Sequence, residues 1–410
     1  MRILQLAPRL PYPLTDGGAI GIYKPTEAIA ASGHEITFVT YPDSDLNITK
    51  EATEKISRFC RIELVSKPLP SRNSTLLRTM FSGAYPIERR MMPEMFVLIK
   101  DIIASQTYDI VHIDGAHMGK YGLWIKEKFG LPVILREHNF EAQIYKRFSE
   151  NTKNPLAKLL TSIHARRVLQ EETKFLNGMD SVITISSEDE HLIHEVAPKA
   201  HMYVIPAGVD TNYYTPQANA ELKNSILWIG GATWEPNLDA IEFFAKDILP
   251  IVVKSIPEAI FDVVGENTDH LQHLVNSGVN SIRLHGRVPD IRPFLARSAV
   301  LICPLRVGGG MRLKLLDFFA SGKAVVSTHI GAEGNLASDG RHILLRDDKE
   351  SFAQAVILLL QNDVLRQELG INARKLAEEE YSWDSIGKSF INVYEHVIRN
   401  FTSEKRLVQP

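Results

Sequence analysis

Short apolar runs rich in β-branched residues recur along the first half of the chain, and longer segments of mixed apolar and polar positions separate them. Runs of this kind, bounded by turn residues and spaced by helical patterns, predict the parallel strands of βαβ units. Between the first two runs, a helical pattern over residues 24–33 ends at Gly33, a residue type that commonly closes helices. The predicted strands of this half are residues 2–6, 35–40, 109–113, 132–135, 181–185 and 202–205.

The same alternation begins again after residue 205. We therefore predict an α/β protein with two doubly wound, Rossmann-like domains that face each other, formed by residues 1–205 and 206–382. A final helix over about residues 383–401 is expected to cross back to the first domain. Ligands of such domains bind beyond the carboxyl ends of the strands, so the cleft between the domains is the predicted site. The predicted strands of the second half are residues 226–231, 260–264, 282–286, 299–304 and 324–328.

Composition and charge exclude several classes of protein. The 410 residues are 44% hydrophobic and 23% charged, which is ordinary for globular proteins and argues against disordered, collagen-like or coiled-coil classes. The net charge of −3, from 46 basic and 49 acidic residues, gives no support to bulk nucleic-acid binding. Two cysteines cannot form a disulfide framework, and they predict a reducing, cytoplasmic location. The apolar runs are too short for a signal peptide or a membrane span.

The sharpest chemical signal lies in residues 304–323. This segment leaves a predicted buried strand, passes through three consecutive glycines and enters a helix whose first turn carries Arg312 and Lys314. Backbone amides at a helix N-terminus form an anion site, and the helix dipole disfavours two cations there unless an anion is bound. The segment therefore predicts an anion site, with a tight glycine turn and two solvated bases as the alternative.

The run Gly308-Gly309-Gly310-Met311-Arg312-Leu313-Lys314 resembles the donor-binding element of the glycosyl transferases group 1 (glycosyltransferase family 4). The branch it resembles has the motif Gly-Gly-Gly-x-Arg-x-Lys-x-x-Glu. The resemblance implies a GT-B fold and transfer of a hexose from a nucleotide-diphospho-sugar to a glycan or lipid-linked acceptor. It also implies retention of the anomeric configuration without a metal or other cofactor. Segments that resemble the same branch are residues 8–13, 16–18, 137–139, 185–189, 229–231, 236–240 and 327–334.

The resemblance assigns donor-binding roles in the second domain. Arg312 and Lys314 would neutralise the diphosphate and stabilise the departing nucleotide diphosphate. Asp317 would accept hydrogen bonds from the ribose hydroxyls. The nucleobase would lie near Arg287 and Val288, where backbone contacts dominate.

This sequence departs from the family pattern at two places. Gly309 replaces the motif Glu that contacts sugar hydroxyls, so sugar recognition would fall to the backbone amides of Gly310, Met311 and Arg312. The Arg and Lys that many members place after the first strand of the donor domain are absent, and residues 232–237 stand there instead. Diphosphate neutralisation would then depend on the cations of the glycine segment.

In the first, acceptor-side domain, the resemblance places His138 beside the transferred sugar, where it would stabilise charge at the anomeric centre. Gly17 and Gly18 would approach the donor phosphates closely, as glycine permits. A satisfied structural histidine and a plain loop are the respective alternatives.

Four further residues are candidates for the acceptor side of the site: Asp16, His112, Asp114 and Glu141. Glu141 would also suit a solvated position that stabilises a helix N-terminus. The spacing of His112, Asp114 and His117 is a weak metal signal, and we expect no metal site there.

Two basic windows, residues 67–100 and 142–170, predict contact with an anionic membrane surface. The second contains an amphipathic helix with apolar residues at helical spacing, and a core-facing helix with a solvated basic face is the alternative. Its apolar positions are Leu156, Leu159, Leu160 and Ile163, and its basic positions include Lys158, Arg166 and Arg167.

Two alternatives to a transferase in cell-surface polysaccharide or glycoconjugate synthesis stay open at this point. Sugar-nucleotide 2-epimerases share the two-domain architecture, and Arg312, Lys314 and Asp317 would serve an isomerase equally well. The missing Glu and the missing Arg and Lys would also suit a sugar-nucleotide-binding protein without catalysis.

Overall fold

The computed structural model describes residues 1–14, 16–71, 83–152, 154–217, 221–275, 281–308 and 310–408. The chain forms two compact units. The first holds residues 1–206 and the segment from residue 386 onward, and the second holds residues 207–385. The chain therefore divides close to the predicted boundaries, residues 205 and 382.

A parallel sheet forms the centre of the first unit. Its strands are β1 (Arg2–Leu6), β2 (Glu35–Thr40), β3 (Arg61–Leu64), β4 (Ile110–Asp114), β5 (Val133–Arg136), β6 (Ser181–Thr184) and β7 (Met202–Val204). They lie in the order β3-β2-β1-β4-β5-β6-β7, so the direction of winding reverses between β1 and β4. Every residue of β4 and β5 is buried, as expected for strands covered on both faces.

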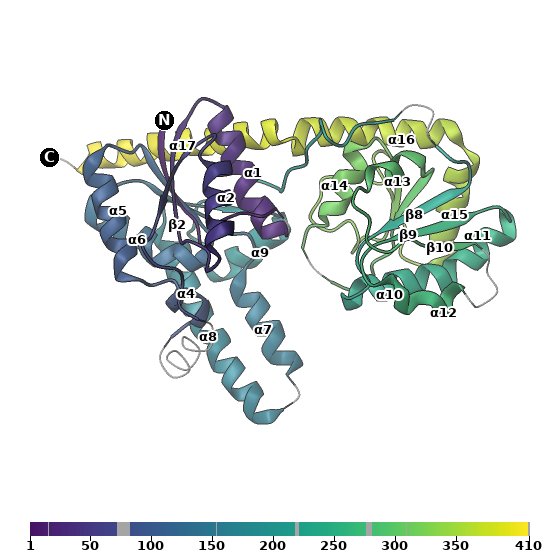
Figure 1. Ribbon diagram of the computed structural model, residues 1–410, viewed down its shortest axis with the longest axis horizontal. Coiled ribbons are helices and arrows are strands. Elements are labelled where there is room, and N and C mark those ends of the chain that lie inside the picture. The colour runs from purple at the N-terminus through teal and green to yellow at the C-terminus, as the bar shows by residue number, and fades with distance from the viewer. Residues whose placement is uncertain are drawn as a thin grey trace. The chain divides into compact units, whose positions relative to one another are not determined.

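The helices of the first unit are α1 (Gly17–Ala31), α2 (Leu46–Ile56), α4 (Tyr85–Glu88), α5 (Pro93–Ser105), η1 (Ala116–Met118), α6 (Gly119–Phe129), α7 (Glu141–Asn151), α8 (Pro155–Gly178), α9 (Ser187–Val196) and most of α17 (Trp383–Val408). Helices α1 and α2 lie on one side of the sheet, and α5 and α6 lie on the other (Figure 1). Helix α1 begins at Gly17 rather than at residue 24, because Asp16 accepts a hydrogen bond from the amide of Ala19 and caps it. Gly17 and Gly18 are therefore the first two residues of a helix and do not lie in a loop before it.

Helices α7 and α8 form an antiparallel pair that projects from the first unit (Figure 1). The predicted amphipathic helix is α8, but its apolar stripe of Leu156, Leu159, Leu160 and Ile163 is exposed. A different face of α8, which includes Ala165, is turned toward α7. The alternative prediction, that this stripe faces the core, is therefore wrong.

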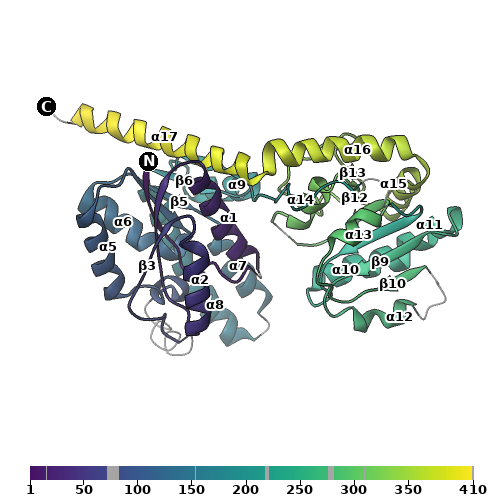
Figure 2. The same cartoon turned by 45° about the horizontal axis from the view of Figure 1, so that its top comes forward.

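Helix α17 is one unbroken helix that lies along the sheet of the first unit (Figure 2). The guanidinium of Arg136 lies 5.1 Å from the ring centre of Phe390, so this helix packs against the end of β5. Tyr394, one turn further on, contacts His112 of β4. Residues near the C-terminus thus pack directly behind the carboxyl ends of the central strands.

The second unit has its own parallel sheet. Its strands are β8 (Ser225–Ile229), β9 (Ile260–Val264), β10 (Ile282–Leu284), β11 (Val300–Cys303), β12 (Ala324–Ser327) and β13 (Leu344–Leu345). They lie in the order β10-β9-β8-β11-β12-β13, with the reversal between β8 and β11. The structure thus confirms two doubly wound α/β units.

The helices of the second unit are α10 (Glu235–Phe243), η2 (Phe244–Ile248), α11 (Leu249–Ser255), η3 (Thr268–Leu271), α12 (Gln272–Val275), α13 (Arg292–Arg297), α14 (Leu313–Ala320), α15 (Lys349–Gln361), α16 (Asp363–Leu376) and η4 (Ala377–Tyr381). Helix α14 follows the glycine segment, as predicted. Its buried face consists of Leu315, Leu316, Phe318 and Phe319, which anchor the helix in the core. Its first turn is therefore held in place by apolar packing, since those side chains are buried among the strands.

Candidate functional site

The loops after β8 and β11 meet at the carboxyl edge of the second sheet, where the winding reverses. Ligands of doubly wound sheets bind at such a reversal. Gly230, after β8, has φ +152, and a Cβ there would stand 2.8 Å from Nζ of Lys314. The positive φ of Gly230 favours glycine, and the missing side chain leaves room for the ammonium of Lys314.

The glycine segment uses backbone conformations that other residues avoid. Gly308 has φ +125 and Gly310 has φ +81, both in the region that favours glycine. Gly309 lies outside the described residues. Arg312 is the N-cap residue of α14, and none of the described side chains caps this helix. The first amides of α14 therefore lack a side-chain cap and suit an anion.

The side chain of Lys314 gives the clearest indication that this site binds a ligand. Its Nζ is buried and has no hydrogen-bond partner among the described residues, and it lies 3.7 Å from the ring centre of Trp228. Burial lowers the pKa of Lys314 to about 8, with a contribution from the nearby charge of Arg312 and an opposing effect of Cys303. A buried ammonium without an anion is costly, so this group favours an anionic ligand.

Arg312 supplies the second cation. Only 8% of this residue is exposed, and its guanidinium lies 5.7 Å from the ring centre of Trp234. Burial lowers the pKa of Arg312, which still leaves the group charged at neutral pH. Arg306, in the same loop, forms an ion pair with Asp239 of α10 and thereby ties the loop to that helix.

Asp317 lies one turn after Lys314 on α14. Burial raises the pKa of Asp317 to about 7, and a hydrogen bond from Tyr214 acts in the opposite direction. The carboxyl group therefore changes its charge near neutral pH and is on the same helical face as the lysine. This position suits a hydroxyl ligand, since hydroxyls bind a carboxylate strongly.

Glu333 was not singled out as a site residue from the sequence. Its Oε2 atom is buried and has no hydrogen-bond partner among the described residues. The next residue, Gly334, packs against Met311. A Cβ added at Gly334 would stand 3.3 Å from Cα of Met311. Glu333 acts electrostatically on Arg312 and raises its pKa. The sequence signal that could have identified Glu333 is an acidic residue in the loop after β12. The fold brings this loop beside the glycine segment.

Arg287 and Val288 follow β10 at the same edge of this sheet. The side chain of Arg287 is exposed and lies 3.8 Å from Glu266, and Val288 is half-buried. The exposed position of Arg287 leaves it available to a ligand. These contacts do not assign nucleobase binding to Arg287 or Val288, so that role stays a prediction.

In the first unit, the corresponding reversal between β1 and β4 lies beside His138. This residue follows β5, and its Nε2 lies 3.0 Å from Oδ1 of Asp114 at the end of β4. Burial lowers the pKa of His138, and the charge of Arg136 lowers it further. His138 is half-buried, and a Cβ on Gly21 of α1 would stand 3.3 Å from its Nδ1.

His112 and Asp114 are completely enclosed, with exposed fractions of 1% and 0%. They lie behind His138 and not on a surface that an acceptor reaches. Sequence analysis missed the partners that complete this cluster, because they come from three separate elements. These partners are Gln5, Arg136 and Tyr394.

Asp16 is occupied as a capping residue, and Arg9 forms an ion pair with it. The hydrogen bond from Arg9 lowers the pKa of Asp16. Glu141 opens α7 and is half-buried, and burial raises its pKa against an opposing effect of Arg90. Both residues lie near strand ends, and their acceptor roles stay predictions.

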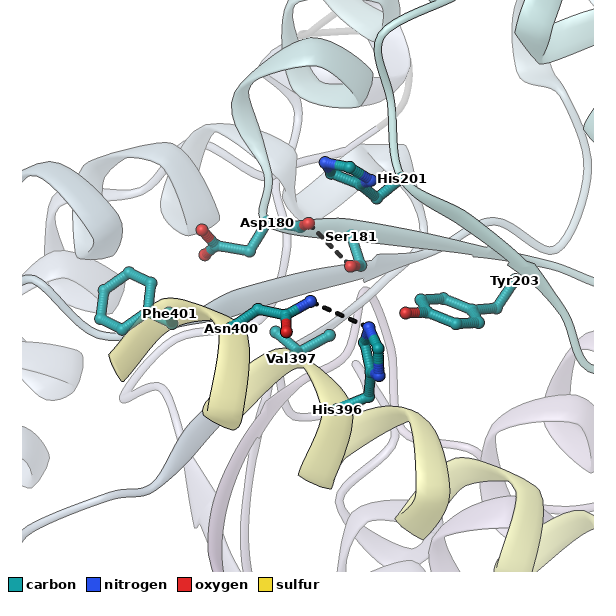
Figure 3. A pocket seen from close by; sticks show the side chains of 8 residues that line it. All are labelled: Asp180, Ser181, His201, Tyr203, His396, Val397, Asn400 and Phe401. Carbon is teal, nitrogen blue, oxygen red and sulfur yellow. Dashed lines mark hydrogen bonds between the residues drawn. The ribbon is translucent and has the colours of Figure 1, made fainter. Parts of the chain in front are cut away.

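A separate pocket lies at the amino ends of β6 and β7, where α17 passes (Figure 3). It is at the opposite edge of the sheet from His138, so it does not belong to the predicted site. The side chains lining the pocket are Asp180, Ser181, His201, Tyr203, His396, Val397, Asn400 and Phe401.

Within the described ranges, no group of three or more His, Cys, Asp and Glu side chains is arranged to hold a metal ion.

Comparison with known proteins finds two matching family descriptions. "Glycosyltransferase Family 4" matches residues 15–213, and "Glycosyl transferases group 1" matches residues 223–362. An uncharacterized 44.6 kDa protein in the cps region of Klebsiella pneumoniae is 22% identical over 93% of this chain and 96% of its own length.

A second relative is an MMP alpha-(1->4)-mannosyltransferase of Mycolicibacterium hassiacum, 23% identical over 94% of this chain and 96% of that enzyme. Among solved structures, Anabaena HepE in complex with UDP superposes with a TM-score of 0.65 at 14% identity. That match covers 97% of this chain and 100% of HepE. At this identity the structural match supports the fold alone.

Proposed function

The chain belongs to the group 1 glycosyltransferases of family 4, and from this premise we propose that it is a retaining, metal-independent hexosyltransferase that uses a nucleotide-diphospho-sugar. The family assignment favours transfer over an isomerase or a non-catalytic binding protein. The relative in the cps region supports an acceptor from cell-surface polysaccharide or glycoconjugate synthesis.

The buried Nζ of Lys314, which has no hydrogen-bond partner among the described residues, is the observation that carries the donor assignment. It lies at the winding reversal of the sheet, close to Gly230 and the uncapped first turn of α14. A diphosphate supplies the anion that this ammonium lacks, and Arg312 supplies a second positive charge. Asp317 then binds the ribose hydroxyls. The UDP bound to the related fold of HepE supports a nucleotide diphosphate as ligand.

Glu333 is the best candidate to replace the carboxylate missing at position 309. Its buried, unpaired Oε2 lies in a loop that packs against Met311, so it belongs to the same side of the site as the backbone amides of residues 310–312. A carboxylate there would accept hydrogen bonds from sugar hydroxyls. The amides alone would otherwise have to select the sugar.

In the transfer step, the bond between the anomeric carbon and the leaving phosphate oxygen breaks. A new bond forms from the acceptor hydroxyl oxygen to the same face of the sugar. The hydroxyl proton passes to the departing phosphate oxygen, so no external base or redox partner is required. Arg312 and Lys314 act most strongly as the leaving group gains charge.

The acceptor side also supports a lipid-linked substrate. Within residues 142–170, the projecting α7–α8 pair carries five basic residues against one acidic residue, alongside its exposed apolar stripe. A basic, apolar surface of this kind suits peripheral contact with an anionic membrane. None of the helices in the described part of the chain is long and apolar enough to span a bilayer.

Product formation with purified enzyme, nucleotide-sugars and candidate acceptors tests the proposal. We expect product only when an acceptor is added, with the anomeric configuration of the donor retained by NMR. Conversion of the donor sugar without an acceptor would instead identify an isomerase. Donor binding without any turnover would identify a binding protein.

Two variants separate the parts of the donor site. Lys314→Ala should abolish binding of both the free nucleotide diphosphate and the nucleotide-sugar. Glu333→Gln should weaken the nucleotide-sugar selectively, because only that ligand carries the sugar hydroxyls. Equal effects on both ligands would remove Glu333 from sugar recognition.

A further inference from the structure

A continuous line of polar contacts runs from the C-terminal helix to His138. The hydroxyl of Tyr394 lies 2.5 Å from Nδ1 of His112. Nε2 of His112 lies 3.5 Å from Oδ1 of Asp114, close enough for an electrostatic contact but without a hydrogen bond among the described residues. The same oxygen lies 3.0 Å from Nε2 of His138. Tyr394, His112 and Asp114 are all buried, so water does not compete for these contacts.

The protonation of Asp114 follows from its neighbours. Although burial opposes ionisation, His112 and His138 hold the pKa of Asp114 well below its usual range. Arg136 lies 3.7 Å from Oδ1, and Gln5 donates a hydrogen bond to Oδ2. Asp114 is therefore a buried carboxylate whose charge is balanced by a buried guanidinium.

The hydroxyl of Tyr394 faces Nδ1 of His112. Burial, with the nearby charge of Asp114, raises the pKa of Tyr394, so its hydroxyl keeps its proton. A hydroxyl that keeps its proton can donate to Nδ1, and this arrangement would leave the His112 proton on Nε2, the nitrogen on the side of Asp114.

His138 is neutral at pH 7, since burial and Arg136 both lower its pKa against the effect of Asp114. The charged or titratable groups that act on it are His112 and Asp114 from β4 and Arg136 from β5. A neutral imidazole beside a carboxylate donates through the nitrogen that faces it, here Nε2. Nδ1 is left as a hydrogen-bond acceptor beside Gly21, where a side chain would crowd it.

We propose that Asp114, His112 and Tyr394 are positioning residues that hold His138 in its Nε2–H tautomer, so that Nδ1 accepts a hydrogen bond from a hydroxyl of the transferred sugar or its acceptor. The proposal rests on the proposed function for the hydroxyl ligand. It makes the C-terminal helix part of the site, through a hydroxyl far from His138 in the sequence. The tautomer itself does not depend on turnover.

Nitrogen-15 NMR of histidine side chains in the ligand-free protein tests the tautomer, with His138→Gln used to assign the signals. We expect His138 to be neutral at pH 7, with a proton on Nε2. Asp114→Ala removes the acceptor that faces Nε2 of His138, so the preference for a proton on Nε2 should be lost. A protonated Nδ1 in the wild type, or an unchanged tautomer in Asp114→Ala, would overturn the proposal.

Kinetics test the role of the line of contacts. Asp114→Asn and Tyr394→Phe should lower kcat roughly 10- to 100-fold, as loss of a partner that orients a histidine typically does, with a smaller change in donor KM. Tyr203→Phe is the matched control, because it removes a hydroxyl from the pocket beside α17 at the opposite edge of the sheet (Figure 3). We expect its kcat to be unchanged.

Two further outcomes are decisive. If Tyr394→Phe lowers the melting temperature but leaves kcat of the folded enzyme unchanged, the residue is only structural and the proposal is wrong. If the wild type shows no transfer with any acceptor, the proposed function fails, and the NMR result still decides whether the tautomer is held as described.

Discussion

Two titrating groups in the donor site bind best in opposite charge states. Lys314, with a pKa of about 8, binds a diphosphate as the ammonium, so affinity falls as the pH rises through that value. Asp317, with a pKa of about 7, binds ribose hydroxyls as the carboxylate, so affinity falls as the pH drops through that value. Affinity should therefore peak between about pH 7 and 8 and decline up to tenfold per unit on either side.

Calorimetry with an intact nucleotide-sugar measures this profile. A free nucleoside diphosphate is unsuitable, because its terminal phosphate titrates near pH 6, whereas both phosphates of the nucleotide-sugar are diesters. Asp317→Asn should remove the acidic limb and keep the basic one. A flat profile between pH 5 and about 9 would contradict the placement of both groups.

In the proposed donor site, Asp317 should also contribute directly to nucleotide affinity. Asp317→Ala removes a buried acceptor of ribose hydrogen bonds, and hydrogen bonds to charged groups are worth about 1.5–3 kcal/mol, or roughly 10- to 100-fold in Kd. Titration of the nucleotide diphosphate at fixed pH measures the loss. Asp363→Ala is a suitable control, since that exposed carboxylate is paired with Arg366 on α16. Unchanged affinity in folded Asp317→Ala would place the ribose elsewhere.

At the scale of elements, α8 has a clear unpartnered face. Leu156 is 67% exposed and Phe148 of α7 is 63% exposed, and Lys158 and Arg166 lie on the same helix pair. We expect the protein to co-sediment with anionic but not zwitterionic vesicles at low salt. Each basic residue near such a surface contributes about 1 kcal/mol, so Lys158→Glu with Arg166→Glu should abolish binding.

The apolar contribution needs its own variant and control. Leu159→Ser with Leu160→Ser should weaken vesicle binding, because these side chains lie on the exposed stripe. The matched control is Val364→Ser with Ile371→Ser, which changes apolar residues on α16 of the other unit that are even more exposed. Binding to neither vesicle type would indicate a soluble acceptor. Equal binding to both types would show that the basic residues do not direct the contact.

The elements also show which features a sequence can predict. Strand β5 was predictable because burial on both faces leaves the apolar run Val133–Leu135, and β4 because Ile110, Val111 and Ile113 are apolar. Strand β3 was missed because it is an edge strand containing Arg61 and Glu63, and β13 because two residues carry no pattern. The helical repeat of α8 was recognised, but periodicity identifies an apolar face without showing what covers it.

In the candidate site, too, some residues could be predicted from the sequence and others could not. Arg312, Lys314 and Asp317 were recognisable because one short segment holds them at the spacing of a loop and a helix. The contact between His112 and Tyr394 joins residues 282 positions apart, and no local pattern reports it. Glu333 was hidden for a related reason, since only the fold shows that its Oε2 is buried without a partner among the described residues.

At the scale of the whole molecule, we expect the positive charge that the departing nucleotide diphosphate requires to come from side chains. Arg312 and Lys314 occupy the reversal of the second sheet, and the part of the chain described here brings no three His, Cys, Asp or Glu side chains into a metal-binding arrangement. A divalent ion at the same phosphates would lie beside both cations and be repelled by them. We therefore expect the enzyme to transfer sugar without a divalent metal.

Transfer rates measured in excess EDTA and after readdition of Mg²⁺ or Mn²⁺ check this expectation. The rate should stay within about twofold of the untreated enzyme, since no catalytic step would lose its source of positive charge. Lys314→Ala provides the complementary test, because added metal should not restore its rate if the ammonium itself stabilises the leaving group. Loss of wild-type activity in EDTA with recovery on readdition would instead require a metal ligand at the donor site, and Asp317 and Glu333 would be the first carboxylates to replace.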